Sequence, residues 1–473
     1  MDESPLIARG TFGSQDLPRE ILGEIFAWCL PDHVSELLIP NSARPPLVLC
    51  YVCRSWRKAA LGTPQLWREL ALVLGYFSVR SLGVGFLRKG FDALEFWRSH
   101  MGALSPSLHF IRQHTRVSIA NEDSSKFIPF RTFFECPAIS NAQTLTLHGF
   151  SATDLMKISQ VLNDTTFKHL KFLVISQPAG REHSTSMLRF PSCPALRRLH
   201  LDCYTELSSS PSSIITAFPW RTITRLSASL QIRQQDRYII LLQCINLSHG
   251  SLTLEFLPAW GTTDVDERKI SYHKILKSLS VRGTPEDIEI AFDKLVFPSV
   301  TALRLSCTRL PTSLRIVHQV LCSTPSLNEL HLQSCLRFGH PQFLRQPFVP
   351  SLSGPLSKSV PHLKTLVIDP IGHQVPATAL PRDLLTLLHS SWLNEGWSSS
   401  HTQKSIEFVL DKGLHFSNSV IADLDREISL SGPLPFCISA RYVEGGLWIW
   451  RQPNAADLRD RWDDLTSFYR NAP

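Results

Sequence analysis

The sequence has no hydrophobic run long enough to cross a membrane as a helix. Its most apolar stretch, residues 70–79, spans only about ten residues. The amino terminus reads MDESPLIARGTFG, which does not resemble a signal peptide. Eleven cysteines are scattered along 473 residues without dense paired spacing, and this pattern indicates free thiols in a reducing compartment. These absences together favour a cytoplasmic or nuclear protein.

The motifs of common catalytic sites are also missing. The sequence has no Gly-Lys-Ser/Thr phosphate loop, no His-Glu-x-x-His zinc motif and no Gly-x-Ser-x-Gly elbow. Cys50 and Cys53 have no second pair of metal ligands close by in the sequence. His331 and Cys335 fall where a predicted strand turns into a loop, so we do not expect them to be ligands. We therefore predict no catalytic residue, no metal site and no cofactor.

Strong charge of one sign is absent as well. The net charge is +7, from 48 basic and 41 acidic residues, and no run of five basic residues occurs. Composition therefore does not support a nucleic-acid surface. A hydrophobic content of 43% indicates a folded chain, and 32 prolines predict many short elements separated by turns. The length allows several domains, or one small module followed by an elongated array.

The clearest pattern lies in residues 17–70, which predict three short helices. Pro18 and Glu20 suit the first turn of a helix, and Gly62 is expected to end the second helix. Thr63 and Pro64 predict the N-cap and first residue of the third. Helical spacing gives the first helix an apolar stripe of Leu17, Ile21, Leu22, Ile25, Phe26, Cys29 and Leu30, and the second an apolar face of Leu49, Val52, Cys53, Trp56 and Ala60.

These residues resemble an F-box. The resemblance rests on Leu17-Pro18-x-Glu20-Ile21-Leu22-x-x-Ile25-Phe26, Val52-Cys53-Arg54-x-Trp56-Arg57 and Pro64-x-Leu66-Trp67. The loop at residues 32–46 is longer than in the commonest pattern, which costs little entropy. An F-box docks on a Skp-type adaptor, which links it to a cullin–RING ubiquitin ligase. The resemblance implies adaptor contacts through Leu17, Pro18, Ile21, Leu22, Ile25, Phe26, Val52, Trp56, Leu66 and Trp67. The alternative is an ordinary amphipathic helical hairpin whose tryptophans belong to the core.

From about residue 105 the pattern apolar-x-x-Leu-x-apolar repeats. Copies that start at 142, 170, 196 and 223 are 28, 26 and 27 residues apart, within the spacing of leucine-rich repeats. On such a strand Leu199 and Leu201 point inward and His200 points outward. Clear copies start at Leu170, Leu196, Val300, Leu327 and Leu363, weaker ones at Ala142, Ile223 and Leu276, and a faint one at Val117. A set of unrelated strands is the alternative.

We therefore predict an α+β or α/β solenoid. A three-helix F-box is followed by an irregular leucine-rich-repeat array, with a curved parallel sheet and helices on its outer face, and by a C-terminal cap. The layout resembles the large F-box-like families of mushroom-forming fungi. The predicted parts are a flexible leader at 1–16, the F-box at 17–70, a helical connector at 71–104, the repeats at 105–395, and terminal strands with a capping helix at 396–473.

The expected function is that of a substrate receptor, in which the repeats bind a target protein and partner enzymes transfer ubiquitin. No nucleic-acid or membrane partner is expected. The candidate target-binding residues, at outward strand positions, are Val174, His200, Arg304, His331 and Val367. The alternative is a non-ligase repeat scaffold whose N-terminal helices cap the solenoid. A receptor leaves Leu17, Ile21 and Trp56 partly uncovered, whereas a cap buries them. An enzyme would instead require a deep pocket with convergent titratable groups.

Overall fold

The structure is a computed structural model of the whole chain. It describes residues 17–30, 40–75, 83–113, 134–150, 152–162, 166–176, 193–206, 218–232, 241, 243–256, 271–292, 295–308, 315–333, 360, 362–369, 404–410, 426, 436–442 and 447–449. These residues divide into two compact units: the first contains β4 (Phe172–Ser176) and the elements before it, and the second contains the strand β5 (Arg198–Glu206) and the elements after it. The predicted leader at 1–16, the faint repeat at Val117 and the predicted capping helix lie outside the described residues.

The first unit begins with four short helices. They are α1 (Arg19–Trp28), α2 (Leu49–Val52), α3 (Arg54–Leu61) and the 3-10 helix η2 (Pro64–Trp67). The predicted first and third helices are confirmed, but the predicted second helix is two helices. Cys53 lies between them in an extended conformation (φ −157°, ψ 172°), and its Sγ accepts a hydrogen bond from the Trp56 backbone N–H at 3.4 Å. The thiol thus caps a new helix where apolar spacing alone predicted a continuous one.

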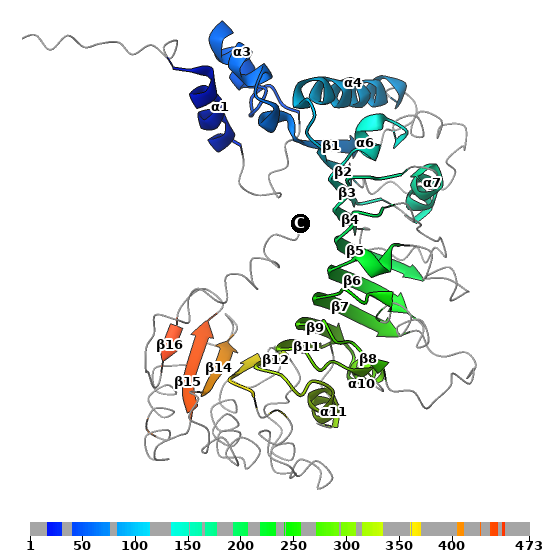
Figure 1. The fold of residues 1–473 in the computed structure, drawn as a ribbon, viewed down its shortest axis with the longest axis vertical. Helices are drawn as coiled ribbons and strands as arrows, with labels where there is room; N and C mark the ends of the chain where they lie inside the picture. Colours follow the sequence, from blue (N-terminus) through cyan, green and yellow to red (C-terminus); the bar gives the residue numbers. More distant parts are fainter. Residues whose placement is uncertain are drawn as a thin grey trace, which may run out of the picture. The chain divides into compact units, whose positions relative to one another are not determined.

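Four parallel strands follow in the first unit (Figure 1). They pair in the order β1-β2-β3-β4, and Leu145 and Leu147 of β3 are in register with Leu173 and Ile175 of β4. The helices α6 and α7 lie on the same side of these strands (Figure 1). The elements, besides β4, are β1 (Glu69–Gly75), β2 (Ser107–Gln113), β3 (Thr144–His148), α4 (Gly83–Met101), α6 (Pro137–Ser140) and α7 (Ala152–Leu162).

The prediction of a helical connector at 71–104 is correct for α4 and wrong for its first residues, which belong to β1. Leu70, Ala71 and Leu72 are all buried, so both faces of this strand are covered. A strand buried on both faces is a continuous apolar run without alternation, and periodicity cannot distinguish it from a buried helix. The parallel strands therefore begin at Glu69, well before residue 105.

The second unit continues the parallel arrangement. Its strands pair in the order β5-β6-β7-β9-β11-β12-β13-β14-β15, and β16 is antiparallel to β15. A short separate sheet pairs β8 with β10. The elements are β6 (Arg225–Ile232), β7 (His249–Phe256), β8 (Ser271–Tyr272), β9 (Ser278–Gly283), β10 (Leu295–Val296), β11 (Ala302–Cys307), β12 (Glu329–Gln333), β13 (Thr365–Asp369), β14 (Lys404–Leu410), β15 (Phe436–Tyr442), β16 (Leu447–Ile449), η4 (Trp220–Thr222), α10 (Pro285–Phe292) and α11 (Arg315–Ser323).

The apolar pairs predicted from the repeating pattern lie on these strands. Leu303 and Leu305 of β11 are in register with Leu330 and Leu332 of β12, and all four are buried. The helices predicted near 153–162, 285–295 and 313–322 are observed as α7, α10 and α11. Those predicted near 214–218, 237–247 and 382–392 lie largely outside the described residues. An α/β fold built on parallel strands is therefore confirmed.

His109 is a buried titratable residue in the sheet of the first unit. Its Nδ1 lies 3.0 Å from Oγ1 of Thr146, its register partner on β3. Burial lowers the pKa of His109 from about 6.5 to about 4. The ring is therefore neutral in the folded chain at neutral pH, and an unfolded chain binds a proton there more readily.

The free energy of unfolding should consequently decrease as the pH falls from about 6.5 towards about 4, because the unfolded state then gains a proton at His109 and the folded state does not. At about pH 5 we expect a loss of about 2 kcal/mol in the free energy of unfolding relative to about pH 7.5. The variant H109Q removes the titration and should lack this part of the loss. Urea titrations of the wild type and H109Q at the two pH values measure the loss in the free energy of unfolding. Equal losses in the two proteins would contradict the assignment of this pH dependence to His109.

Two glycines have positive φ, and replacing each with alanine should destabilise the chain by a different amount. Gly149 (φ +78°) follows β3, and a Cβ there would lie 2.4 Å from the Arg112 backbone oxygen. Gly102 (φ +64°) follows α4, and a Cβ there would have no neighbour within 4 Å. We expect G102A to cost about 1 kcal/mol, from backbone strain alone. G149A should cost about 3 kcal/mol or more, because the backbone must also move. Thermal melting of the two variants measures both costs. Equal shifts in their melting temperatures would contradict the expected difference.

Candidate functional site

The N-terminal helices expose an unusual number of large apolar side chains. Of those exposed among the described residues, six lie between positions 17 and 52. Ile21, Ile25 and Trp28 are spaced four and three residues apart on α1, so they share one face of the helix. We call this group the exposed stripe, and its members are Leu17, Ile21, Ile25, Trp28, Tyr51 and Val52.

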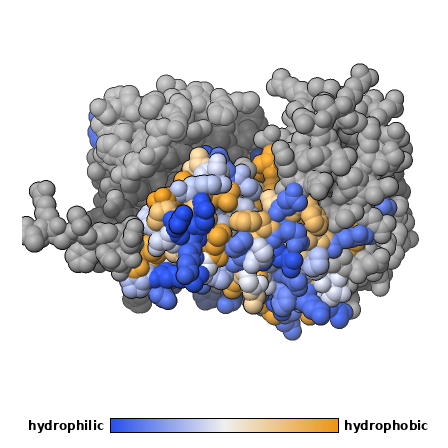
Figure 2. Space-filling view, turned by 90° about the horizontal axis from the view of Figure 1, so that it is seen from above, coloured by the Kyte–Doolittle hydropathy of each residue, from blue (hydrophilic) through white to orange (hydrophobic). Residues whose placement is uncertain are grey.

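The exposed fractions show how open the stripe is. Ile21 is 48% exposed, Val52 56% and Trp28 86%. Folded monomers expose single apolar residues often, but contiguous exposed groups of large ones usually mark an interaction surface. Figure 2 views the described surface from the top of Figure 1, where these helices lie, and shows hydrophobic side chains beside strongly hydrophilic ones. The stripe therefore has the character of a partner-binding surface.

The opposite face of α1 holds the helix in place. Leu22 and Phe26 are buried, and the Phe26 ring lies 4.9 Å from the Trp56 ring, centroid to centroid. A Cβ at Gly23 would lie 3.0 Å from Oγ1 of Thr63, so the absence of a side chain allows α1 to approach the start of η2. The stripe members on α1 thus lie on a helix whose other face is packed.

The η2 helix fixes this module to the sheet of the first unit. Leu66 and Trp67 are fully buried, and Nε1 of Trp67 donates a hydrogen bond to the Ala60 backbone oxygen at 2.9 Å. The Trp67 ring lies 5.1 Å from that of Trp97 on α4, in an edge-to-face arrangement. Trp97 in turn donates through Nε1 to the Glu69 backbone oxygen of β1 at 3.0 Å.

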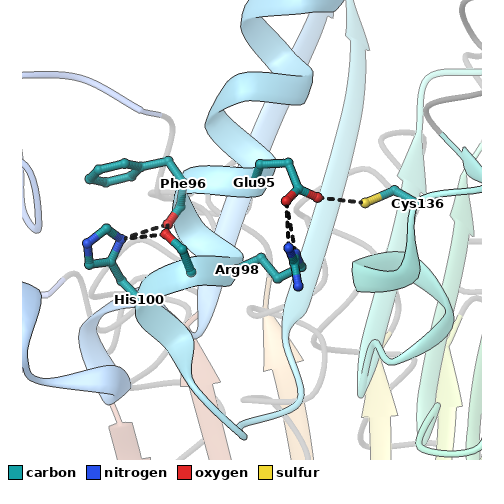
Figure 3. Close-up of polar contacts among 6 residues, drawn as sticks. Glu95, Phe96, Arg98, His100 and Cys136 are labelled. Atoms are coloured by element: carbon teal, nitrogen blue, oxygen red, sulfur yellow. Dashed lines mark hydrogen bonds and ion pairs between the residues drawn. The ribbon is translucent and has the colours of Figure 1, made fainter.

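The C-terminal half of α4 carries polar contacts that join it to the segment before α6 (Figure 3). Glu95 forms an ion pair with Arg98 at 2.8 Å and accepts a hydrogen bond from the Cys136 thiol at 3.5 Å. The hydrogen bond from Arg98 lowers the pKa of Glu95, and burial raises the pKa of the Cys136 thiol. Nδ1 of His100 lies 2.8 Å from the Phe96 backbone oxygen. The ion pair is largely exposed, so these contacts position α4 more than they stabilise it.

The structure divides the ten predicted adaptor-binding residues into two groups. Five are exposed and Trp56 is half-buried, whereas four are buried in the core of the module. A buried side chain offers little surface to a partner, so direct contact through those four stays a prediction that their burial does not support. The exposed ones are Leu17, Pro18, Ile21, Ile25 and Val52, and the buried ones are Leu22, Phe26, Leu66 and Trp67.

Two members of the exposed stripe were missed by sequence reasoning. Trp28 could have been found, because it lies three residues after Ile25 and seven after Ile21, on the same helical face. Tyr51 carried no such signal, because α2 has only four residues and too short a pattern to define a face.

The predicted target-binding residues are also divided. Val174 and Val367 are buried, so their role as target contacts stays a prediction that their burial does not support. His200, Arg304 and His331 are half-buried. Register places Arg304 beside His331, and Nη2 of Arg304 donates to Gln333 Oε1 at 2.9 Å, whereas His200 lies on β5, several strands away. Strand alternation gives the direction of a side chain, but not whether another segment covers it.

The cysteine pair in the N-terminal module has structural contacts. Burial raises the pKa of the Cys50 thiol, and Cys53 caps α3 as described above. Among the described residues no group of three His, Cys, Asp or Glu side chains could hold a metal ion. Within the same residues no helix is both long and apolar enough to span a membrane.

No model of a known protein family matches this chain, and no curated protein matches it in sequence. A functional assignment therefore depends on the exposed stripe, on the residues beneath it and on the strands that follow. Among the described residues the stripe holds six of the eleven exposed large apolar side chains.

The two tryptophans of the module should differ sharply in their effect on stability. W67A removes a fully buried ring and its hydrogen bond, so we expect a loss of about 3–5 kcal/mol in the free energy of unfolding. W28A removes a ring that is 86% exposed and should change that free energy by less than about 0.5 kcal/mol. Denaturant unfolding of both variants measures the difference. A large loss in W28A would show that the stripe is part of the core.

Proposed function

We propose that this chain is the substrate receptor of a cullin–RING ubiquitin ligase. Its N-terminal helices dock on a Skp-type adaptor through the exposed stripe, and its parallel strands carry a target protein. The observation that supports this most directly is that Leu17, Ile21, Ile25 and Val52 are exposed, and that the same residues carry the F-box resemblance. A cytoplasmic or nuclear location follows from the proposal.

The two faces of α1 explain why the F-box pattern contains both buried and exposed residues. Leu22 and Phe26 pack on Trp56 and the start of η2, which builds a rigid platform. Ile21 and Ile25 lie on the other side and are available to an adaptor. Large apolar anchors of this kind dominate interface energetics, and removing one costs about 2 kcal/mol. A preorganised platform also avoids the entropic cost of folding on binding.

The alternative function, a repeat scaffold capped by its N-terminal helices, predicts the opposite burial. A cap has to bury Leu17 and Ile21 against the array, and these side chains are 42% and 48% exposed. Trp56 is half-buried, which fits a residue at the margin of the platform. The burial pattern therefore favours the receptor over the cap.

The strands are proposed to be degenerate leucine-rich repeats of a solenoid. Supporting this are the starting intervals of the repeats and the in-register leucines of β11 and β12. In this function the chain performs no chemistry of its own. It raises the effective concentration of target lysines near the ubiquitin-charged enzyme, so proximity is the mechanism.

The first test is adaptor binding by a variant of the stripe. I21S/V52S removes two exposed anchors without disturbing the core, and we expect it to weaken binding of a purified Skp-type adaptor about a thousandfold. Isothermal titration calorimetry with the full chain measures the affinity. The matched control is L104S/I245S, which removes two exposed apolar residues outside the stripe.

The control variant should bind the adaptor like the wild type. Absence of adaptor binding by the folded wild-type chain would overturn the receptor assignment and leave the scaffold. An equal loss in both variants would show that general surface hydrophobicity, rather than the stripe, governs binding.

A further inference from the structure

A second surface lies at the N-terminal ends of strands β6, β7 and β9 in the second unit. Backbone hydrogen bonds align the residues that enter these strands: Ser248 N–H donates to the Thr224 oxygen at 2.9 Å, and Lys277 N–H donates to the Ser248 oxygen at 2.8 Å. These loops carry several basic and large apolar side chains beside neutral polar ones. We call the basic and exposed large apolar side chains the edge surface, and its members are Arg198, Arg221, Arg225, Lys274, Lys277, Ile245, Tyr272 and Ile275.

The basic members of the edge surface form no ion pair within the part of the chain that the structure describes. Four of the five are exposed. The segments that carry Arg221, Arg225, Lys274 and Lys277, which are 218–229 and 271–281, contain no aspartate or glutamate, whereas the strand of Arg198 carries Asp202 four residues further on. Register places Arg198 beside Arg225 and Arg225 beside His249. Both Arg225 and Lys277 act on His249 and lower its pKa, after the larger effect of burial, so the cations converge around this ring.

The apolar members are held in place by buried polar contacts. Ile245, Tyr272 and Ile275 are 52%, 58% and 46% exposed. His273, which is buried, lies between two of them in the sequence, and its Nε2 lies 2.8 Å from the Cys244 backbone oxygen. This contact brings the segments of Ile245 and Tyr272 side by side.

Further contacts fix the same loops. The His273 N–H donates to the Val296 oxygen at 3.0 Å, and Nδ2 of Asn246 donates to the Arg221 oxygen at 2.6 Å. The exposed apolar side chains therefore lie on loops held by backbone hydrogen bonds. Ile275, in the loop that enters β9, lies between Lys274 and Lys277 in the sequence. Exposed apolar side chains near several cations without an ion pair among the described residues are costly without a partner, because like charges repel and apolar area stays in water.

We propose that the edge surface binds an acidic protein segment whose apolar side chains contact Ile245, Tyr272 and Ile275. Carboxylates of the segment neutralise the cations, and its apolar side chains remove the exposed hydrophobic area from water. Nucleic acid would satisfy the cations but leave the two isoleucines uncovered. The inference deepens the proposed function by naming the class of target, and it rests on that function only in treating the bound segment as a ligase target.

The test uses the full chain and a fluorescein-labelled peptide in which glutamates alternate with leucine and phenylalanine. Fluorescence anisotropy measures its affinity for the wild type, K274E/K277E and Y272S/I275S. Each variant should weaken binding at least about tenfold, the first by charge reversal and the second by loss of apolar contacts. Wild-type binding should also weaken with added salt, because salt screens the charges.

The matched control for charge is K168E/K171E, which makes the same change of charge at two exposed lysines of the first unit. It should bind the peptide like the wild type. Both edge variants should keep their thermal melting midpoints, since the changed side chains are exposed, and should still bind the Skp-type adaptor. Adaptor binding without peptide binding would overturn this inference alone, and peptide binding without adaptor binding would overturn only the proposed function.

A polyanion control separates the acidic segment from nucleic acid. A single-stranded oligonucleotide of equal charge should bind more weakly than the peptide and should be indifferent to Y272S/I275S. Tighter binding of the oligonucleotide, or a peptide affinity unchanged in Y272S/I275S, would overturn the inference, as would equal losses in K168E/K171E and K274E/K277E.

Discussion

Parallel pairing in register is the constraint on which both units depend. A strand of five residues such as β12 buries only Leu330 and Leu332 on its inner side, too little to form a core by itself. Pairing with β11 places these leucines beside Leu303 and Leu305, so that neighbours complete a shared apolar layer. The same principle joins β3 to β4 in the first unit. Each element is stable only through its neighbours, as in stacked repeat folds.

The same register also arranges the residues that are not in the core. In a parallel sheet equivalent positions of adjacent strands lie side by side, so a residue type that recurs at one position forms a row. Arg198 and Arg225 are neighbours for this reason, and their charges accumulate at the strand entrances. The pairing that builds the core thus also concentrates charge at one edge, which gives the second unit a surface of a definite chemical kind.

The N-terminal module differs from the strands, because part of its apolar surface stays exposed. It is too small to bury all its apolar side chains, so it packs one face of α1 and leaves the other exposed. Trp67 carries the connection between this module and the sheet, since it contacts Ala60, Trp97 and Phe96 at once. These contacts hold the module against α4 and β1 of the first unit.

The sequence by itself determined which residues share a face. The spacing of Ile21 and Ile25 placed them together, the leucine pairs located the strands, and Pro64 marked the start of η2. These are local properties, because backbone geometry fixes where side chains point within a few residues. The repeating pattern was therefore enough to predict parallel strands alternating with helices.

Only the tertiary structure decided which face is covered. Leu22 and Ile21 are adjacent and both apolar, yet the first packs on the platform and the second is exposed. Val174 and Val367 occupy predicted outward positions and are nevertheless buried. Burial depends on segments distant in the sequence, and periodicity holds no information about them. The candidate site was thus predictable as a set of residues, whereas its exposed half was set by long-range packing.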